Sequence, residues 1–212
     1  MPVTYDQITE YHQQLSAHQD PVLLRMEEEA RRDQFPIIGP ASGKMCYLLA
    51  RAIGARKVFE LGSGYGYSTL WFARAVRENG GGTVHHTVWD EELQRRAKAN
   101  VEEAGYSDLV RFHLGEAVQT LRETDDTFDI VFNDIDKDGY PASLPVMKQK
   151  LRVGGLIIID NMLWHGRIFD PEDRDATTAG VREFTRLLQE DPDFVFQLIP
   201  VRDGIITALR VS

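Results

Sequence analysis

The pattern of apolar and polar residues changes near residue 55. Before that point apolar residues recur at helical spacing, and Pro21 can open a helix whose apolar face is formed by Val22, Leu23, Met26 and Ala30. After it, short runs rich in β-branched and aromatic residues alternate with amphipathic stretches of helical length. The pattern predicts an N-terminal helical part over residues 1–54 and an α/β part over residues 55–212.

Five strand-like runs follow one another in the α/β part. They span residues 57–61, 83–89, 109–114, 128–133 and 156–160. Five β-α repeats predict a mainly parallel sheet with right-handed crossovers and helices on both faces. Because ligands bind beyond the carboxyl ends of the strands in such sheets, we expect the chemistry at that edge.

The end of the chain predicts a hairpin. After a helix over about residues 178–190, two strand-like runs, 194–200 and 205–211, flank only four residues, 201–204. Such a link is too short for a parallel crossover. We therefore expect an α/β, Rossmann-like, doubly wound sheet of seven strands with an antiparallel last strand. The chain has no Pro/Ser-rich linker, composition shift or repeat, so we expect one domain over residues 1–212.

Composition excludes several kinds of partner. The chain has 24 Lys and Arg against 33 Asp and Glu, a net charge of −9, which disfavours nucleic acid. No apolar run approaches the roughly 18 residues of a membrane span, and no basic start precedes an apolar stretch, so we expect neither membrane insertion nor a secretory signal. The single cysteine, Cys46, lies in an apolar run and is expected to be a buried thiol. A cytoplasmic location follows.

A glycine-rich turn follows the first strand. Residues 62–66 read Gly-Ser-Gly-Tyr-Gly, and a helix begins near residue 69. Such a turn gives a ligand close approach to the backbone and free N–H donors. The dinucleotide fingerprint requires glycine at its sixth position, where Tyr67 stands, so pyrophosphate binding and a nicotinamide-dependent dehydrogenase are disfavoured. A tight structural turn without a ligand is the alternative.

Acidic residues follow the fourth and fifth strands. If these strands are neighbours, Asp134, Asp160 and Asn161 converge as three oxygen ligands. Oxygen ligands suit Mg²⁺, Ca²⁺ or Mn²⁺ rather than Zn²⁺. Ordinary acidic caps at helix N-termini are the alternative interpretation.

Three segments resemble one enzyme family. Residues 60–68, Glu-Leu-Gly-Ser-Gly-Tyr-Gly-Tyr-Ser, resemble the first motif of class I S-adenosylmethionine (SAM)-dependent methyltransferases, with the Gly-Tyr-Ser ending of the catechol and caffeoyl-CoA O-methyltransferases. Residues 134–140 are similar to that family's Asp-x-Asp-Lys-x-x-Tyr segment, and residues 160–164 to its Asp-Asn-x-Leu-Trp segment. The resemblance extends from about Phe35 to Asp203 and Gly204.

The resemblance implies SAM and a hard divalent cation as cofactors. It implies cofactor contacts from Glu60, Gly62, Ser63, Gly64, Gly66, Ser68, Ala117 and Asp136. It also implies that Asp134, Asp160 and Asn161 hold the metal and that Lys137 is the catalytic base. The alternative for Lys137 is a surface lysine, and Trp164 is a candidate aromatic wall for a planar substrate.

The second strand departs from the family pattern. Family members usually carry an acidic residue at its end, which hydrogen-bonds the cofactor ribose, and Val88 stands there in this chain. Either Asp90 substitutes from two residues further on, or ribose recognition is weaker.

The expected function is a metal-dependent O-methyltransferase of vicinal dihydroxy aromatics. A neutral phenol is a poor nucleophile, so a cation that chelates both hydroxyls and a lysine that takes the proton favour methyl transfer. A methyltransferase with another small-molecule acceptor and a cofactor-binding protein without turnover are the alternatives. The acceptor itself is not readable, because the N-terminal helices and residues 165–178 would build its pocket. We expect a homodimer through the side of the sheet that carries residues 194–211.

Overall fold

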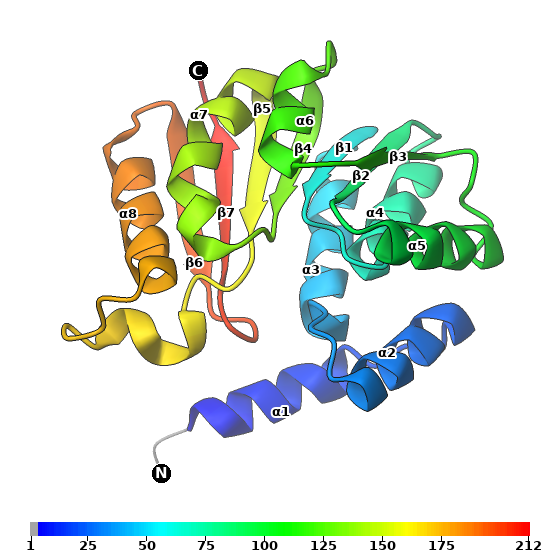
Figure 1. The fold of residues 1–212 in the computed structure, drawn as a ribbon, viewed down its shortest axis with the longest axis horizontal. Helices are drawn as coiled ribbons and strands as arrows, with labels where there is room; N and C mark the ends of the chain where they lie inside the picture. Colours follow the sequence, from blue (N-terminus) through cyan, green and yellow to red (C-terminus); the bar gives the residue numbers. More distant parts are fainter. Residues whose placement is uncertain (1–3) are drawn as a thin grey trace.

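The computed structural model describes residues 4–212, and Figure 1 shows their arrangement. The α-helices are α1 (Tyr5–Leu15), α2 (Pro21–Asp33), α3 (Gly39–Ala52), α4 (Tyr67–Glu78), α5 (Glu91–Glu103), α6 (Ala117–Glu123), α7 (Tyr140–Lys150) and α8 (Ala176–Glu190). Two 3₁₀ segments are η1 (Lys137–Gly139) and η2 (Trp164–Phe169). The strands are β1 (Lys57–Leu61), β2 (Thr83–Val88), β3 (Val110–Leu114), β4 (Phe128–Asn133), β5 (Leu151–Ile159), β6 (Phe194–Ile199) and β7 (Ile205–Arg210).

The seven strands form one sheet in the order β3-β2-β1-β4-β5-β7-β6. Strands β1 to β5 pair in parallel, and β7 is antiparallel to both of its neighbours. The predicted seven-stranded, doubly wound sheet with an antiparallel last strand is confirmed. The strand order reverses between β1 and β4, which is the position where ligands bind in sheets of this kind.

The sheet separates two hydrophobic cores. Alternate residues of each central strand enter opposite cores: Val58 packs with α2 to α5 and Phe59 with α6 to α8, as do Ile158 and Ile157 in β5. Figure 1 shows α3 and α4 on one side of the sheet and α7 and α8 on the other. Two covered faces explain why the parallel strands are apolar runs rather than strict alternations.

Helices α1 and α2 lie beyond the carboxyl ends of β4 and β5 (Figure 1). Helix α2 begins where predicted, because Pro21 occupies its first turn and the Asp20 carboxylate accepts hydrogen bonds from the N–H groups of Val22 and Leu23. By contrast, α1 buries none of its residues. None of the helices within residues 4–212 is long and apolar enough to cross a membrane.

Several predicted boundaries differ from those of the structure, most of them by one or two residues. Strand β5 begins at Leu151, five residues before the predicted start, and its pairing with β4 shifts between Phe128 and Ile130. The interruption is Gly154, whose φ of +77° breaks the apolar run that the prediction relied on. Helix α8 begins at Ala176 rather than 178, because the Asp175 carboxylate caps it through Thr177 N.

The hairpin link between β6 and β7 lies at the functional edge. Strand β6 runs in the same direction as β5, since each is antiparallel to β7, so the link leaves β6 at its carboxyl end. Two backbone hydrogen bonds attach the link to the end of β5: Met162 N donates to Gly204 O (2.9 Å) and Leu163 N to Asp203 O (2.7 Å). The sheet therefore brings residues near 160 and near 203 together.

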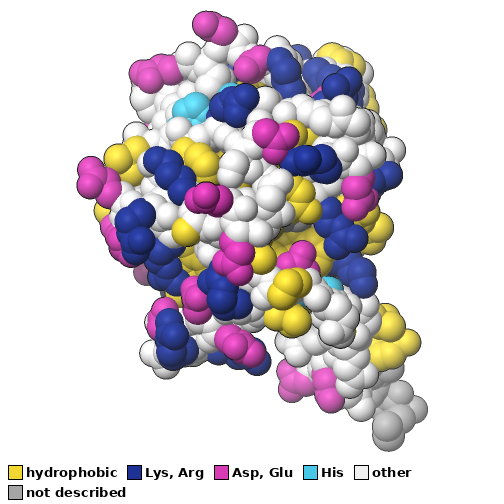
Figure 2. All heavy atoms as spheres, turned by 90° about the vertical axis from the view of Figure 1, so that its right-hand side faces the viewer, with side chains coloured by type: hydrophobic (Ala, Val, Ile, Leu, Met, Phe, Trp, Pro, Cys, Tyr) yellow, Lys and Arg dark blue, Asp and Glu magenta, His cyan; other side chains and the backbone are white. Residues whose placement is uncertain are grey.

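Basic and acidic side chains are intermingled on the surface in Figure 2. Many of these side chains form ion pairs, such as Arg25 with Glu29 and Arg95 with Glu92. The described part of that face therefore lacks a continuous basic surface that could follow a phosphate backbone.

Candidate functional site

The glycine turn after β1 is packed against the turn after β4 and the end of strand β2. A β-carbon at Gly62 (φ +81°) would lie 2.7 Å from the Asp134 backbone oxygen, so glycine here allows the β1 and β4 turns to touch. Ser63 N donates to Thr87 O (2.9 Å), and Thr87 N donates to Ser63 Oγ (3.1 Å). A β-carbon at Gly64 would lie 3.2 Å from the Phe35 ring, which therefore covers the turn.

Glu60 is a buried carboxylate beside this turn. One oxygen, Oε2, accepts a hydrogen bond from Thr69 Oγ1 (2.6 Å), and Oε1 has no partner among residues 4–212. Burial raises the pKa of Glu60 to about 7, and the hydrogen bond from Thr69 opposes the shift. A buried carboxylate oxygen without a partner fits the ammonium end of an amino-acid ligand.

Asp134 and Asp160 end the adjacent strands β4 and β5. The last paired residues of these strands are Asn133 and Ile159, so the two aspartates follow side by side. Asp160 is 2% exposed, and its Oδ1 has no partner among residues 4–212. Burial and the charge of Asp134 raise the pKa of Asp160 to about 7, and burial raises that of Asp134 against the opposing charge of Lys137.

These carboxylates fit a hard cation. No cluster of three or more His, Cys, Asp or Glu side chains suited to a metal occurs within residues 4–212. The predicted trio has two carboxylates, and its third member is the amide of Asn161, whose Nδ2 donates to Asp203 Oδ2 (3.3 Å). A buried carboxylate whose pKa is raised by burial and by a half-buried carboxylate beside it, next to an amide, matches the oxygen ligands that Mg²⁺ prefers.

Lys137 is buried at this site. It is 8% exposed, and its Nζ donates to Asp134 Oδ1 (2.8 Å) and to Ile135 O (3.1 Å). The alternative of a surface lysine is wrong. Helix α8 holds the Lys137 backbone in place, because a β-carbon at Gly180 would overlap the Lys137 carbonyl oxygen.

Trp164 stands beside this lysine. The Lys137 Nζ lies 5.6 Å from the centre of the Trp164 ring, and Trp164 Nε1 donates to Thr177 Oγ1 (3.0 Å). Backbone φ angles of +46° at Trp164 and +54° at His165 mark a constrained turn. The indole is thus available as the aromatic wall that the sequence predicts.

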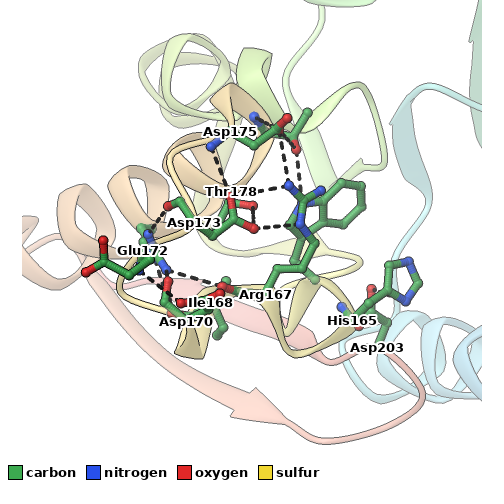
Figure 3. Close-up of polar contacts among 12 residues, drawn as sticks. His165, Arg167, Ile168, Asp170, Glu172, Asp173, Asp175, Thr178 and Asp203 are labelled. Atoms are coloured by element: carbon green, nitrogen blue, oxygen red, sulfur yellow. Dashed lines mark hydrogen bonds and ion pairs between the residues drawn. The ribbon is translucent and has the colours of Figure 1, made fainter.

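Ion pairs fix the loop after Trp164 (Figure 3). Arg167 Nε donates to Asp173 Oδ2 (2.7 Å), as does Thr178 Oγ1 (3.1 Å). Hydrogen bonding from Arg167 lowers the pKa of Asp173 to about 2. At the other end of the loop, His165 N donates to Asp203 Oδ1 (2.6 Å), which joins the loop to the β6–β7 link.

The remaining predicted cofactor residues also lie at the carboxyl edge of the sheet, but each follows a different strand. Val88 ends β2 and is buried, and the Asp90 carboxylate accepts a hydrogen bond from Leu93 N (2.8 Å) as the cap of α5. Ala117 opens α6, and Asp136 is exposed before η1. One oxygen of the Asp90 carboxylate thus accepts a hydrogen bond from the first turn of α5. The role of Asp90 in binding the cofactor ribose stays a prediction.

A cleft of about 530 Å³ lies between the N-terminal helices and the β6–β7 link. Its lining includes Phe35, Ile37, Pro40 and Arg202. Phe35 and Arg202 were not among the predicted site residues. For Phe35 the sequence offers one signal, Pro36, which follows the end of α2. For Arg202 it offers none, because the hairpin pattern does not reveal the strand order that places the link at the carboxyl edge.

Comparisons with known proteins agree with this geometry. Residues 13–211 match the family described as O-methyltransferase. A putative O-methyltransferase of Mycolicibacterium smegmatis is 35% identical over 202 residues, which cover 94% of this chain and 95% of that protein. A probable O-methyltransferase of Mycobacterium tuberculosis is 34% identical over 202 residues, which cover 94% of this chain and 89% of that protein.

Solved structures show the same fold. The O-methyltransferase TomG of Streptomyces achromogenes, in complex with SAM, has a TM-score of 0.86 and 29% identity, covering 97% of this chain and 96% of TomG. An O-methyltransferase of Bacillus cereus, in complex with SAH, has a TM-score of 0.87 and 28% identity, covering 98% of this chain and 100% of that chain.

Proposed function

This chain belongs to the O-methyltransferase family and is a SAM-dependent O-methyltransferase; from this premise we propose that its acceptor is a vicinal dihydroxy aromatic, catechol-like or hydroxycinnamoyl, and that a hard divalent cation assists the reaction. The resemblance seen in residues 60–68 is thereby confirmed at the level of the family. The acceptor and the cation are the proposed part.

The observation that carries the proposal is the contact between Lys137 and Asp134. A buried amine lies 2.8 Å from a carboxylate that itself adjoins the buried Asp160. A base next to an oxygen-ligand site suits an acceptor whose two adjacent hydroxyls need both orientation and loss of a proton.

Different residues bind the cation, take the proton and position the acceptor ring. When bound at Asp134, Asp160 and Asn161, a divalent cation supplies stabilisation of a phenolate oxygen. Lys137 accepts the phenolic proton at Nζ, and the Trp164 indole packs against the acceptor ring.

The cofactor end of the site is separate from this machinery. The Glu60 carboxylate binds the ammonium of SAM, whereas Ser68 and the N-terminus of α4 bind its carboxylate. Holding donor and acceptor in line accounts for much of the rate gain, since orientation contributes about 7–11 kcal/mol in favourable cases.

A methylation assay over catechols, flavonoids and hydroxycinnamoyl esters, with matched monohydroxy compounds as controls, tests this proposal. We expect turnover of the vicinal diols alone, its loss with a chelator, and its recovery with Mg²⁺. Turnover of monohydroxy acceptors at equal rates, or turnover unaffected by the chelator, would reject it.

We also propose that the protein is a homodimer. The edge strand β6 and its neighbour β7 expose Val195 (63%) and Leu209 (38%). Helix α1 exposes Tyr5, Ile8, Tyr11 and Leu15 and buries no residue of its own. Exposed apolar side chains on an edge strand and on an unburied helix support contact with a second copy.

A further inference from the structure

Arg202 forms one wall of the cleft. It stands in the β6–β7 link, and its side chain lies over the start of α3, since a β-carbon at Gly39 would be 3.5 Å from Arg202 Nε and 3.7 Å from its Cζ. The wall contributed by the segment after α2 and the start of α3 is largely apolar and includes Phe35, Pro36, Ile37, Pro40 and Ala41, whereas α2 contributes the charged Glu27 and Arg31. The cleft thus combines an apolar surface with one guanidinium from the link.

The backbone at Arg202 is unfavourable for a side chain. Its φ is +50°, in the left-handed region where glycine is strongly preferred, and the nearby Gly204 has φ +81°. Glycine would make this turn with less strain than arginine does. An arginine in this conformation therefore points to a role for its side chain rather than for the turn.

The guanidinium is not used inside the protein. Among residues 4–212, no carboxylate oxygen lies within 4.0 Å of it, and it donates no hydrogen bond that meets ordinary geometric criteria. The adjacent Asp203 carboxylate is occupied by Asn161 Nδ2 and His165 N. Arg167, in the neighbouring loop, is by contrast paired with Asp173 (Figure 3). The N–H donors of the Arg202 guanidinium are therefore available to bind a ligand in the cleft.

Arg202 is also near the proposed metal ligands. Burial raises the pKa of Asp134 and of Asp160, and the positive charge of Arg202 opposes the shift at both. The influence on both carboxylates places the guanidinium within electrostatic range of them. The backbone hydrogen bonds from Met162 N to Gly204 O and from Leu163 N to Asp203 O also hold the link that carries Arg202 beside the end of β5, which Asp160 follows.

We propose that Arg202 determines acceptor specificity by binding a carboxylate of the acceptor, so that aromatic acids bearing a vicinal diol are preferred over neutral catechols. A guanidinium forms two parallel hydrogen bonds with a carboxylate, which fixes the orientation as well as the charge of the acceptor. The apolar wall packs against the ring and its side chain. This inference rests on the proposed function, because it assumes that the diol end lies at Asp134 and Asp160.

The test compares 3,4-dihydroxycinnamic acid with its neutral amide at saturating SAM and Mg²⁺. These acceptors have almost the same size and differ in charge. The key variant is Arg202→Gly, which removes the guanidinium and suits a φ of +50°, so its melting temperature should equal or exceed that of the wild type. Arg202→Lys keeps a charge, and Arg31→Met removes an exposed cation of α2 from the same cleft as the matched control.

We expect the wild type to prefer the acid. In Arg202→Gly, KM for the acid should rise by about tenfold or more, as for loss of a charged hydrogen-bonded pair, while kcat and both constants for the amide stay within about twofold. Arg202→Lys should recover part of the affinity, and Arg31→Met should behave as the wild type. Calorimetric titration of the acid into the protein with S-adenosylhomocysteine should show the same loss in Arg202→Gly without turnover.

Three results would overturn the inference. Equal use of acid and amide by the wild type removes the proposed selectivity. An equal loss on both acceptors in Arg202→Gly, with an altered Mg²⁺ requirement, shows that Arg202 acts on Asp134 and Asp160 instead. The same rise in KM for the acid in Arg31→Met would show that the overall positive charge of the cleft, rather than Arg202 itself, attracts the acid. Absence of turnover with every vicinal diol would reject the proposed function itself, and that outcome is distinct because it affects acid and amide alike in the wild type.

Discussion

The Nζ atom of Lys137 lies 2.8 Å from Oδ1 of Asp134, so the proposed base and a proposed cation ligand form one ion pair. Replacing either residue changes the charge around the other. The base and the metal ligands can be tested separately with variants of Lys137 and Asp160. Lys137 is paired with Asp134 and Asp160 is not, so the two variants change different interactions.

Lys137→Met should lower kcat by about 10²–10⁴-fold, the usual contribution of a positioned acid–base group. The loss should be smaller for nitrocatechols, whose hydroxyl ionises without help, so steady-state kinetics on acidic and ordinary catechols is the measurement. Lys57→Met, at an exposed lysine paired with Asp126, is the control and should change little. Equal impairment on both acceptor classes would indicate a positioning role for Lys137.

Asp160→Asn should lower turnover by about 100-fold or more and remove the response to Mg²⁺, since a bound cation contributes several kcal/mol to charge stabilisation. Calorimetry should show SAM affinity within a few-fold of the wild type, because the SAM contacts lie at the glycine turn. Asp138→Asn, at an exposed acid of η1, is the matched control. Full activity of Asp160→Asn would remove this residue from the cation site.

SAM affinity should depend on pH through Glu60. Burial raises the pKa of Glu60 to about 7, and only the ionised carboxylate attracts an ammonium. The Kd for SAM should therefore fall as the pH rises from about 5.5 to about 7. Glu60→Gln should bind SAM weakly and without this trend, whereas the surface variant Glu123→Gln should retain it. A pH-independent Kd in the wild type would contradict the assignment.

Stability should fall in mild acid because of the histidines in the sheet. Burial lowers the pKa of His85 to about 4, with a further contribution from His113, and burial lowers that of His86 to about 3. Above the ordinary histidine pKa of about 6.5, both states are neutral; below it, only the unfolded chain takes up protons, so the folded state loses stability as the pH falls towards 4.

His85→Phe isolates this effect. A phenyl ring is compatible with the neighbouring rings of Phe59 and Phe128, which lie 5.7 and 5.1 Å from the imidazole. Between pH 7 and 5 the variant should lose about 2 kcal/mol less unfolding free energy than the wild type, as measured by urea denaturation. His165→Phe, at an exposed histidine, should follow the wild-type curve. Parallel curves for His85→Phe and the wild type would contradict the prediction.

The dimer predicts a mass of about 48 kDa by light scattering, twice the 24.1 kDa of the chain. Val195→Asp places a charge on the exposed face of β6 and should shift the protein towards the monomer. Val153→Asp, at an equally exposed position of β5, should not. A wild-type mass of about 24 kDa at micromolar concentration would reject the dimer.

Much of this site was predictable, because a short sequence segment contains both a strand and the acidic residue at or after its end. Glu60, Asp134 and Asp160 each come at or directly after the end of an apolar strand, and parallel strands bring such ends to one edge. The β-α alternation therefore predicts the edge before any contact is known.

The burial of Lys137 was not predictable in this way. It depends on the approach of α8 at Gly180, more than forty residues along the chain, and on Trp164. The placement of Arg202 depends on the position of β7 between β5 and β6, which a hairpin pattern alone does not reveal. Both positions arise from long-range packing.

The close contact between Gly180 and the Lys137 carbonyl also bears on engineering of the enzyme. The loop of residues 165–175 carries its own ion pairs, so an exchange of this loop with a relative offers a route to new acceptors without disturbing the base. The first turns of α8 offer no such freedom, since any side chain at position 180 would displace Lys137. Loop grafts for altered substrate range should therefore stop before Ala176, and random libraries should leave codon 180 unchanged.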